Sequence, residues 1–106
     1  MPKFLFATSY TAEGLKGLQK EKASGRKKAA VAAVESLGGK LEAMYFALGS
    51  DDVFVIADLP DTAAAAALGL AVSASGMIHT RTTALLTVDE CDRAIEKTVK
   101  FRAPGR

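Results

Sequence analysis

Apolar and polar positions alternate along four segments of the chain, and such alternation is typical of β-strands that bury one face. The segments are residues 3–9, 40–48, 52–59 and 77–87. The third contains the nearly continuous apolar run Val53–Ala57. A strand that is apolar on both faces indicates a central position in a sheet.

Helical spacing separates these segments. Thr11 is a predicted N-cap for a first helical region, which Ser24-Gly25 interrupts and which continues to Leu37. Gly38-Gly39 is predicted to end it, because glycine readily adopts the conformation that follows a helix.

Two further helices are predicted from their caps. Asp61 precedes an Ala-rich helix at 62–74, which is thin enough to lie close on a sheet. Thr87 and Glu90 have the spacing of a capping box and open a last helix that extends to about Val99.

The resulting order is β-α-β-β-α-β followed by a C-terminal helix. It predicts an α+β fold of the ferredoxin-like kind, an antiparallel sheet with its two main helices on one face. We expect a single domain over residues 1–100 and a short basic tail at 101–106.

Both faces of this predicted sheet are apolar. Alternation within the strands divides the apolar residues between the two faces. One face is predicted to contain Phe4, Phe6, Met44, Phe46, Phe54 and Ile56, and the other Leu5, Ala7, Leu41, Ala43, Tyr45, Val53 and Val55. Helices can cover only one face, and monomers rarely expose the apolar face that remains. The sequence therefore predicts that the chain pairs with itself, as a homodimer or a higher homo-oligomer.

Composition agrees with a small domain of this kind. The chain has 106 residues, of which 49% are hydrophobic and 25% charged. Lys plus Arg exceeds Asp plus Glu by 14 to 12, and a net charge of +2 is too small to indicate a nucleic-acid partner. The basic run Lys20–Lys28 has no interleaved aromatic residues, so we interpret it as a solvated face.

Several other classes of site or location are disfavoured. Cys91 has no second cysteine to pair with and no clustered His, so neither a disulfide nor a metal site is expected, and a reducing cytoplasm is favoured. The apolar run at 4–7 is too short for a secretion signal, and 62–80 has too few large apolar residues for a membrane span. The glycines lack the spacing of a nucleotide-binding loop, so no cofactor is expected.

Three stretches resemble the bacterial GYD-domain family: residues 3–17, 34–40 and 55–61, and residues 81–87 are also similar to it. The resemblance covers most of the chain. It implies the dimeric α+β barrel group, in which two ferredoxin-like sheets pack face to face, and it implies no assigned activity. At the family's motif turn Gly49 and Asp52 match, whereas Asp51 stands where the family has tyrosine.

Candidate chemistry centres on His79 and Arg81, which alternation places on one face of the fourth strand. A titratable imidazole beside a guanidinium suits a small organic anion, in a cavity against a helix or a neighbouring subunit. Tyr10 and Tyr45 could add phenol groups. The alternative is that His79 is exposed or structural and that both tyrosines only pack.

Two classes of function remain open. The first is an oligomeric module that binds a small molecule or serves assembly. The second is a cofactor-free enzyme, similar to a monooxygenase or isomerase, acting on a small organic anion; this reading rests on fold analogy alone. One histidine without a neighbouring acid favours the first class.

Overall fold

The computed structural model describes all 106 residues. Four strands and three helices alternate along the chain: β1 (Lys3–Tyr10), α1 (Ala12–Ser36), β2 (Lys40–Phe46), β3 (Val53–Asp58), α2 (Thr62–Ala74), β4 (Ile78–Leu85) and α3 (Val88–Ile95). The predicted α+β class is confirmed.

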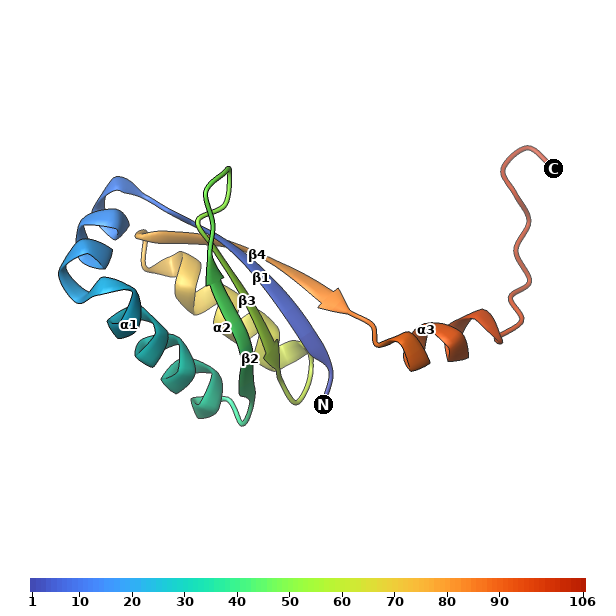
Figure 1. Ribbon diagram of the computed structural model, residues 1–106. Coiled ribbons are helices and arrows are strands. Elements are labelled where there is room, and N and C mark those ends of the chain that lie inside the picture. Colours follow the sequence, from blue (N-terminus) through green and yellow to red (C-terminus); the bar gives the residue numbers. More distant parts are fainter.

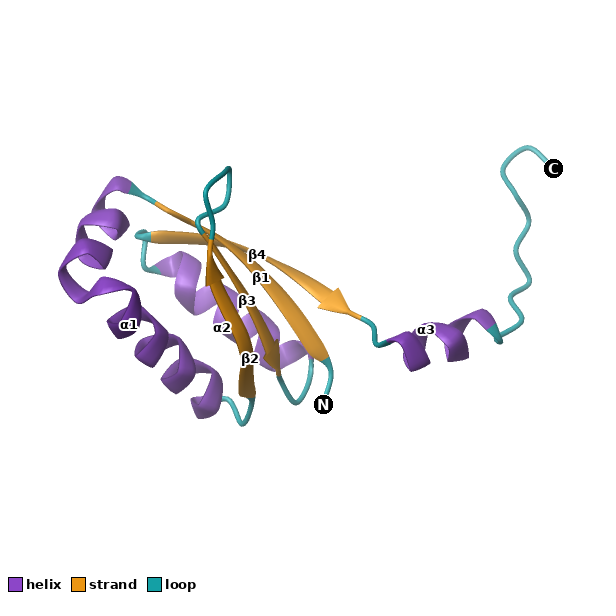
Figure 2. Ribbon diagram, in the orientation of Figure 1, coloured by secondary structure: helices purple, strands orange, loops and turns teal.

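The strands form one sheet in the order β2-β3-β1-β4, and every neighbouring pair is antiparallel. Figure 1 shows α1 and α2 on the same side of this sheet. The other side carries no helix, and we call it the open face. Figure 2 shows α3 beyond the end of β4, away from the sheet and from both other helices.

The predicted helix caps are confirmed. The Thr11 and Asp61 side chains accept hydrogen bonds from the backbone N–H groups of Gly14 and Ala64, at 3.2 and 2.8 Å. Thr87 and Glu90 form the reciprocal capping box at the start of α3. Each cap satisfies a backbone donor that the first helical turn leaves free.

Two helix boundaries differ from the prediction. The interruption of α1 is at Lys22, with φ 64° and ψ 170°, rather than at Ser24-Gly25. The last helix ends at Ile95 and does not reach Val99. Both differences concern stretches of polar and charged residues, where apolar spacing gives the weakest signal.

The predicted faces of β3 were wrong. Val55 is paired with both Phe6 and Met44, so it lies with them on the helix side. Phe54 and Ile56 therefore lie on the open face. The predicted alternation within β3 is correct, but the phase between strands depends on the pairing register.

A β-bulge between Leu41 and Ala43 corrects a second position. Before the bulge Leu41 pairs with Ala57 and faces the helices, whereas Ala43 pairs with Ile56 on the open face. The extra residue changes the alternation, which sequence spacing does not reveal.

The core lies between the sheet and the two helices and is thin. Only 8 of 106 residues are buried. The main cluster comes from the sheet and from both helices: Phe4 and Phe6 of β1, Val34 of α1, Ala57 and Leu59 in and after β3, and Ala65 of α2. The many alanines explain this, because they bury little apolar surface each.

Asp58 belongs to a charged cluster at the edge of the open face. The Lys3 ammonium donates to Asp58 at 2.9 Å and also to Glu42. The hydrogen bond to Glu42, followed by that to Asp58, raises the pKa of Lys3. The cluster therefore joins β1, β2 and β3 at one end of the sheet.

Candidate functional site

A cavity of about 120 Å³ lies between the helix-covered side of the sheet and the two main helices. Eleven of its fourteen lining residues are hydrophobic. The sheet contributes Phe6, Met44, Val55 and Ile78, and the helices contribute small or branched residues such as Ala30, Ala33, Leu68 and Val72. An apolar chamber with few polar groups is typical of small-molecule sites.

Small side chains on the helices leave this space. Ala29, Ala30 and Ala33 line the cavity from α1 and fill little of it. Gly69 lets α2 lie close on β4, since a Cβ there would be 3.3 Å from the Thr82 hydroxyl. The kink at Lys22 reorients the first part of α1 relative to the rest.

A second hollow adjoins the cavity beside the first turns of α1. Gly14, Gly17, Glu21 and Met77 line it, and it shares Tyr10, Arg26, Leu68 and Val72 with the cavity. The shared residues make one region that extends from the middle of the sheet to the kink in α1.

Tyr10 and Arg26 are the polar groups common to both hollows. Arg26 Nη1 lies 3.4 Å from Glu21 Oε2, and the arginine side chain is 29% exposed. Burial raises the pKa of Tyr10, which Arg26 lowers to a smaller extent. The phenol is therefore protonated at neutral pH and can donate a hydrogen bond beside a guanidinium.

Threonine hydroxyls are the other polar groups of the cavity. Thr8 and Thr80, paired across β1 and β4, are 3.3 Å apart at their hydroxyl oxygens. The Thr80 hydroxyl also donates to the Ala7 carbonyl at 3.4 Å. These contacts satisfy the hydroxyls within the sheet, so Tyr10 and Arg26 are better placed to bind a ligand.

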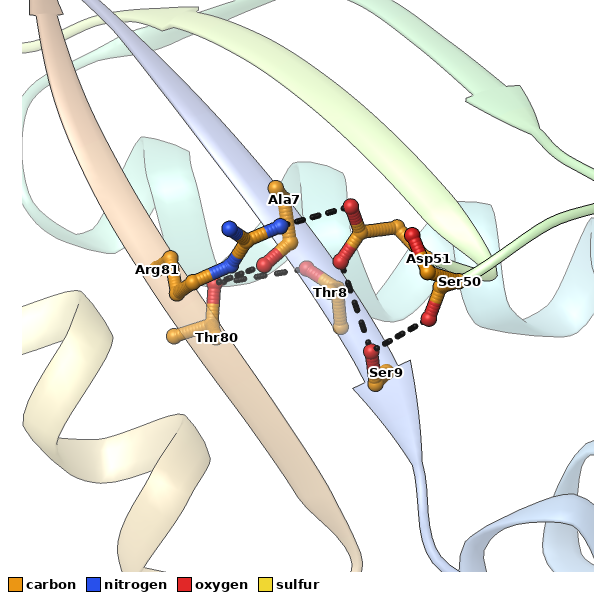
Figure 3. A network of polar contacts seen from close by, with 7 residues as sticks. All are labelled: Ala7, Thr8, Ser9, Ser50, Asp51, Thr80 and Arg81. Carbon is orange, nitrogen blue, oxygen red and sulfur yellow. Dashed lines mark hydrogen bonds and ion pairs between the residues drawn. The ribbon is translucent and has the colours of Figure 1, made fainter.

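A separate polar network lies on the open face, at the turn between β2 and β3 (Figure 3). Arg81 Nη2 donates to Asp51 Oδ2 at 2.6 Å, and the Ser9 hydroxyl is 3.4 Å from Asp51 Oδ1 and 3.2 Å from the Ser50 carbonyl. The Asp51 side chain is 13% exposed and that of Arg81 67%. Asp51 thus fastens the turn to β1 and β4.

Asp52 holds the same turn on its other side. Its carboxylate accepts a hydrogen bond from the Tyr10 backbone N–H at 2.9 Å, and its own N–H donates to the Thr8 carbonyl at 2.8 Å. Gly49 is exposed, and a Cβ added to it would meet nothing within 4 Å. These contacts give Asp52 a structural role at the end of β1.

The structure separates the four residues proposed as ligand contacts. Tyr10 lines the cavity, whereas His79 and Arg81 share the open face and Tyr45 is exposed there too, since it pairs with Phe54. His79 and Arg81 were expected in a cavity against a helix or against a neighbouring subunit. Their side chains do not lie against a helix, because both helices cover the other face of the sheet. A location against a neighbouring subunit stays a prediction.

Arg26 is the cavity residue that the sequence reading missed. It belongs to the run Lys20–Lys28, whose lysines are exposed as a solvated face requires. A guanidinium four residues before Ala30, on the same helix face, was the available signal. Cys91 is a free cysteine and is exposed. No cluster of three or more His, Cys, Asp or Glu side chains that could hold a metal ion occurs in the structure.

The GYD domain family model matches residues 4–95. The chain belongs to the GYD domain family. No curated protein and no solved structure matches it. Asp51 of this GYD domain makes the contacts to Ser9 and Arg81 described above. None of its helices combines the length and apolar character needed to cross a membrane.

Proposed function

We propose that this GYD domain is an oligomeric module that binds a small organic anion in the cavity between its sheet and helices. The observation that carries the proposal is the apolar cavity with Tyr10 and Arg26 at one end. Its volume of about 120 Å³ is similar to that of an engineered apolar cavity of about 150 Å³ that holds benzene. A single aromatic or branched aliphatic acid is a suitable size.

Charge and hydrogen bonding favour a carboxylate or enolate. The guanidinium of Arg26 has five N–H donors, and its ion pair with Glu21 at 3.4 Å is loose. The protonated Tyr10 phenol adds a neutral donor. Arginine binds carboxylates with paired, charge-assisted hydrogen bonds, which gives both affinity and orientation.

Assembly through the open face is the second part of the proposal. Leu5, Ala7, Phe54 and Ile56 form its centre, and Tyr45 is exposed beside them. The strand order β2-β3-β1-β4, with both helices on one side, supports a ferredoxin-like arrangement. Two such sheets packed face to face would make a dimeric α+β barrel and cover this surface.

Ligand binding is tested by thermal unfolding with benzoate, phenylacetate and branched aliphatic acids, each beside its uncharged amide. An acid at ten times its dissociation constant stabilises the fold by about 1.4 kcal/mol, a shift of several degrees. We expect Arg26→Gln to lose this shift and the His79→Ala, Arg81→Ala double variant to keep it. The opposite pattern would place the ligand on the open face.

The alternative is a cofactor-free enzyme that uses the same cavity, and Tyr10 supplies the observation in its favour. Its phenol lies beside the Arg26 guanidinium, which opposes the effect of burial on the Tyr10 pKa. Acids recovered from the screen and analysed by mass spectrometry separate the two functions. Unchanged compounds support a binding module, and a chemical change abolished in Tyr10→Phe would support an enzyme.

A further inference from the structure

The C-terminal arm, residues 86–106, consists of α3 and the irregular segment after it. It projects from the end of β4 and lies against no other element in Figure 1. Its large apolar side chains are exposed: Val88 by 80%, Ile95 by 74% and Phe101 by 75%, with Leu86 and Val99 similar. The radius of gyration, 16.8 Å, exceeds the value of about 13 Å for a compact chain of this length.

The capping and the apolar face of α3 are typical of a helix that packs against another protein surface. A complete capping box opens it, and hydrogen bonding of the Glu90 carboxylate to the Thr87 backbone N–H, followed by that to the Thr87 side chain, lowers the pKa of Glu90. Val88, Cys91 and Ile95 follow helical spacing and share one face, while Asp89 and Arg93 lie on the other. Helices shorter than about 12 residues are marginal in water, so this one needs a surface to cover its apolar face.

We propose that the arm of each chain docks on a second copy of the same chain. The inference rests on the proposed assembly and adds a named segment to the interface. The molecule carries two uncovered apolar surfaces, the open face and the arm, which begins where the edge strand β4 ends. In a dimer with two-fold symmetry the arm of each chain lies on the partner. One symmetric interface then covers both open faces and both arms.

Charge also favours a second copy as the occupant. The helix α3 carries Asp89, Glu90 and Asp92 against one Arg93, whereas α1 carries the basic run Lys20–Lys28. Figure 1 shows α3 and this part of α1 at opposite ends of the molecule, so an arm cannot reach its own basic run. Between two copies the opposite charges attract and orient the encounter.

The first experiment measures association of the full-length chain by analytical ultracentrifugation. We expect the Val88→Asp, Ile95→Asp double variant to raise the dimer dissociation constant at least 100-fold. The control Arg93→Gln, on the opposite side of α3, is expected to change it less than threefold. Unfolding of each variant by urea checks that the body, which the arm does not contact, remains folded.

The second experiment locates the arm. A chain with Cys91→Ser and Arg93→Cys carries a nitroxide at residue 93 and is mixed with a ¹⁵N-labelled Cys91→Ser chain, so amide broadening in the labelled chain reports only contacts between copies. Broadening of amides in its sheet or in α1 is the expected result.

The other possible results of these two experiments would overturn either the proposed assembly or the docking of the arm. A parent that sediments as a monomer would overturn the proposed assembly and this inference with it. A dimer without broadening between copies, or with an unchanged dissociation constant in the double variant, would overturn the docked arm alone. Broadening found only when nitroxide and ¹⁵N are on the same chain would show that the arm folds back on its own body.

Discussion

Asp51 shows how one residue changes what its neighbours can do. Its carboxylate is bound by Arg81 at 2.6 Å and by Ser9 at 3.4 Å. Arg81 is therefore engaged within the chain, which reduces its value as a ligand contact. Because this arginine is 67% exposed, the pair contributes at most about 1 kcal/mol to stability.

Tyr10 is the residue whose ionisation reports most directly on the cavity. Burial raises its pKa above the usual value of about 10, so the phenol keeps its proton in the folded chain at a pH where the unfolded chain loses it. Stability is then fully present below about pH 10 and falls as the pH rises through the folded-state pKa.

We predict that a Tyr45→Phe variant, in which Tyr10 is the remaining tyrosine, titrates above pH 10 by absorbance at 295 nm. Its free energy of unfolding should fall more steeply above pH 10 than that of a Tyr10→Phe variant. The comparison is needed because the Lys3 pKa is also raised and contributes to the alkaline loss of stability in both. A Tyr10 midpoint at or below 10 would mean that the cavity end is solvated.

Among the elements, α1 determines most about the cavity. Its first turn lies on the start of β4, where Thr11 N–H donates to the Met77 carbonyl at 2.9 Å. Gly14 is buried at this contact, since a Cβ there would be 2.1 Å from the Met77 carbonyl oxygen. Gly17, one turn later, has no atom within 4 Å of such a Cβ.

These two glycines give a matched pair of substitutions in one helix. Gly17→Ala should raise the free energy of unfolding by up to about 1 kcal/mol, because alanine is the better helix former. Gly14→Ala should lower it by about 1–3 kcal/mol, because the backbone of β4 must move. Urea unfolding measures both, and equal effects would mean that α1 does not approach β4 as closely as described.

At the scale of the whole molecule, the thin core and the apolar open face point the same way. With 8 of 106 residues buried, the monomer leaves much of its apolar surface in water. A second copy on the open face, with the arms docked, would bury this surface without any change in the fold. Assembly is thus expected to supply a large share of the stability.

Phe54 and Val53 test this division between faces. Phe54→Asp places a charge on the open face and should give a folded but less stable monomer by ultracentrifugation. Val53→Asp, one residue earlier, buries an unpaired charge on the helix side, where Val53 is 2% exposed, and should cost more than about 3 kcal/mol. A Phe54→Asp variant that still dimerises would exclude the open face as the interface.

The sequence by itself determined the features that depend on neighbouring residues. The caps at Thr11, Asp61 and Thr87, the four strands and the apolar character of both sheet faces were all predicted. Each depends on backbone geometry within a few residues, which side-chain type and spacing report directly. Membership in the GYD family also followed from the residues alone.

Only the tertiary structure decided which residues of neighbouring strands share a face of the sheet and which polar side chains line the same cavity. The phase of Phe54 and Val55 depends on pairing with β1 and β2, and the bulge after Leu41 changes it within β2. Tyr10 of β1 and Arg26 of α1 line the same cavity, while Tyr45, His79 and Arg81 lie on the opposite face of the sheet. Register between strands and the path of a helix are set by contacts between distant residues, and one sequence read for its local pattern carries no direct measure of them.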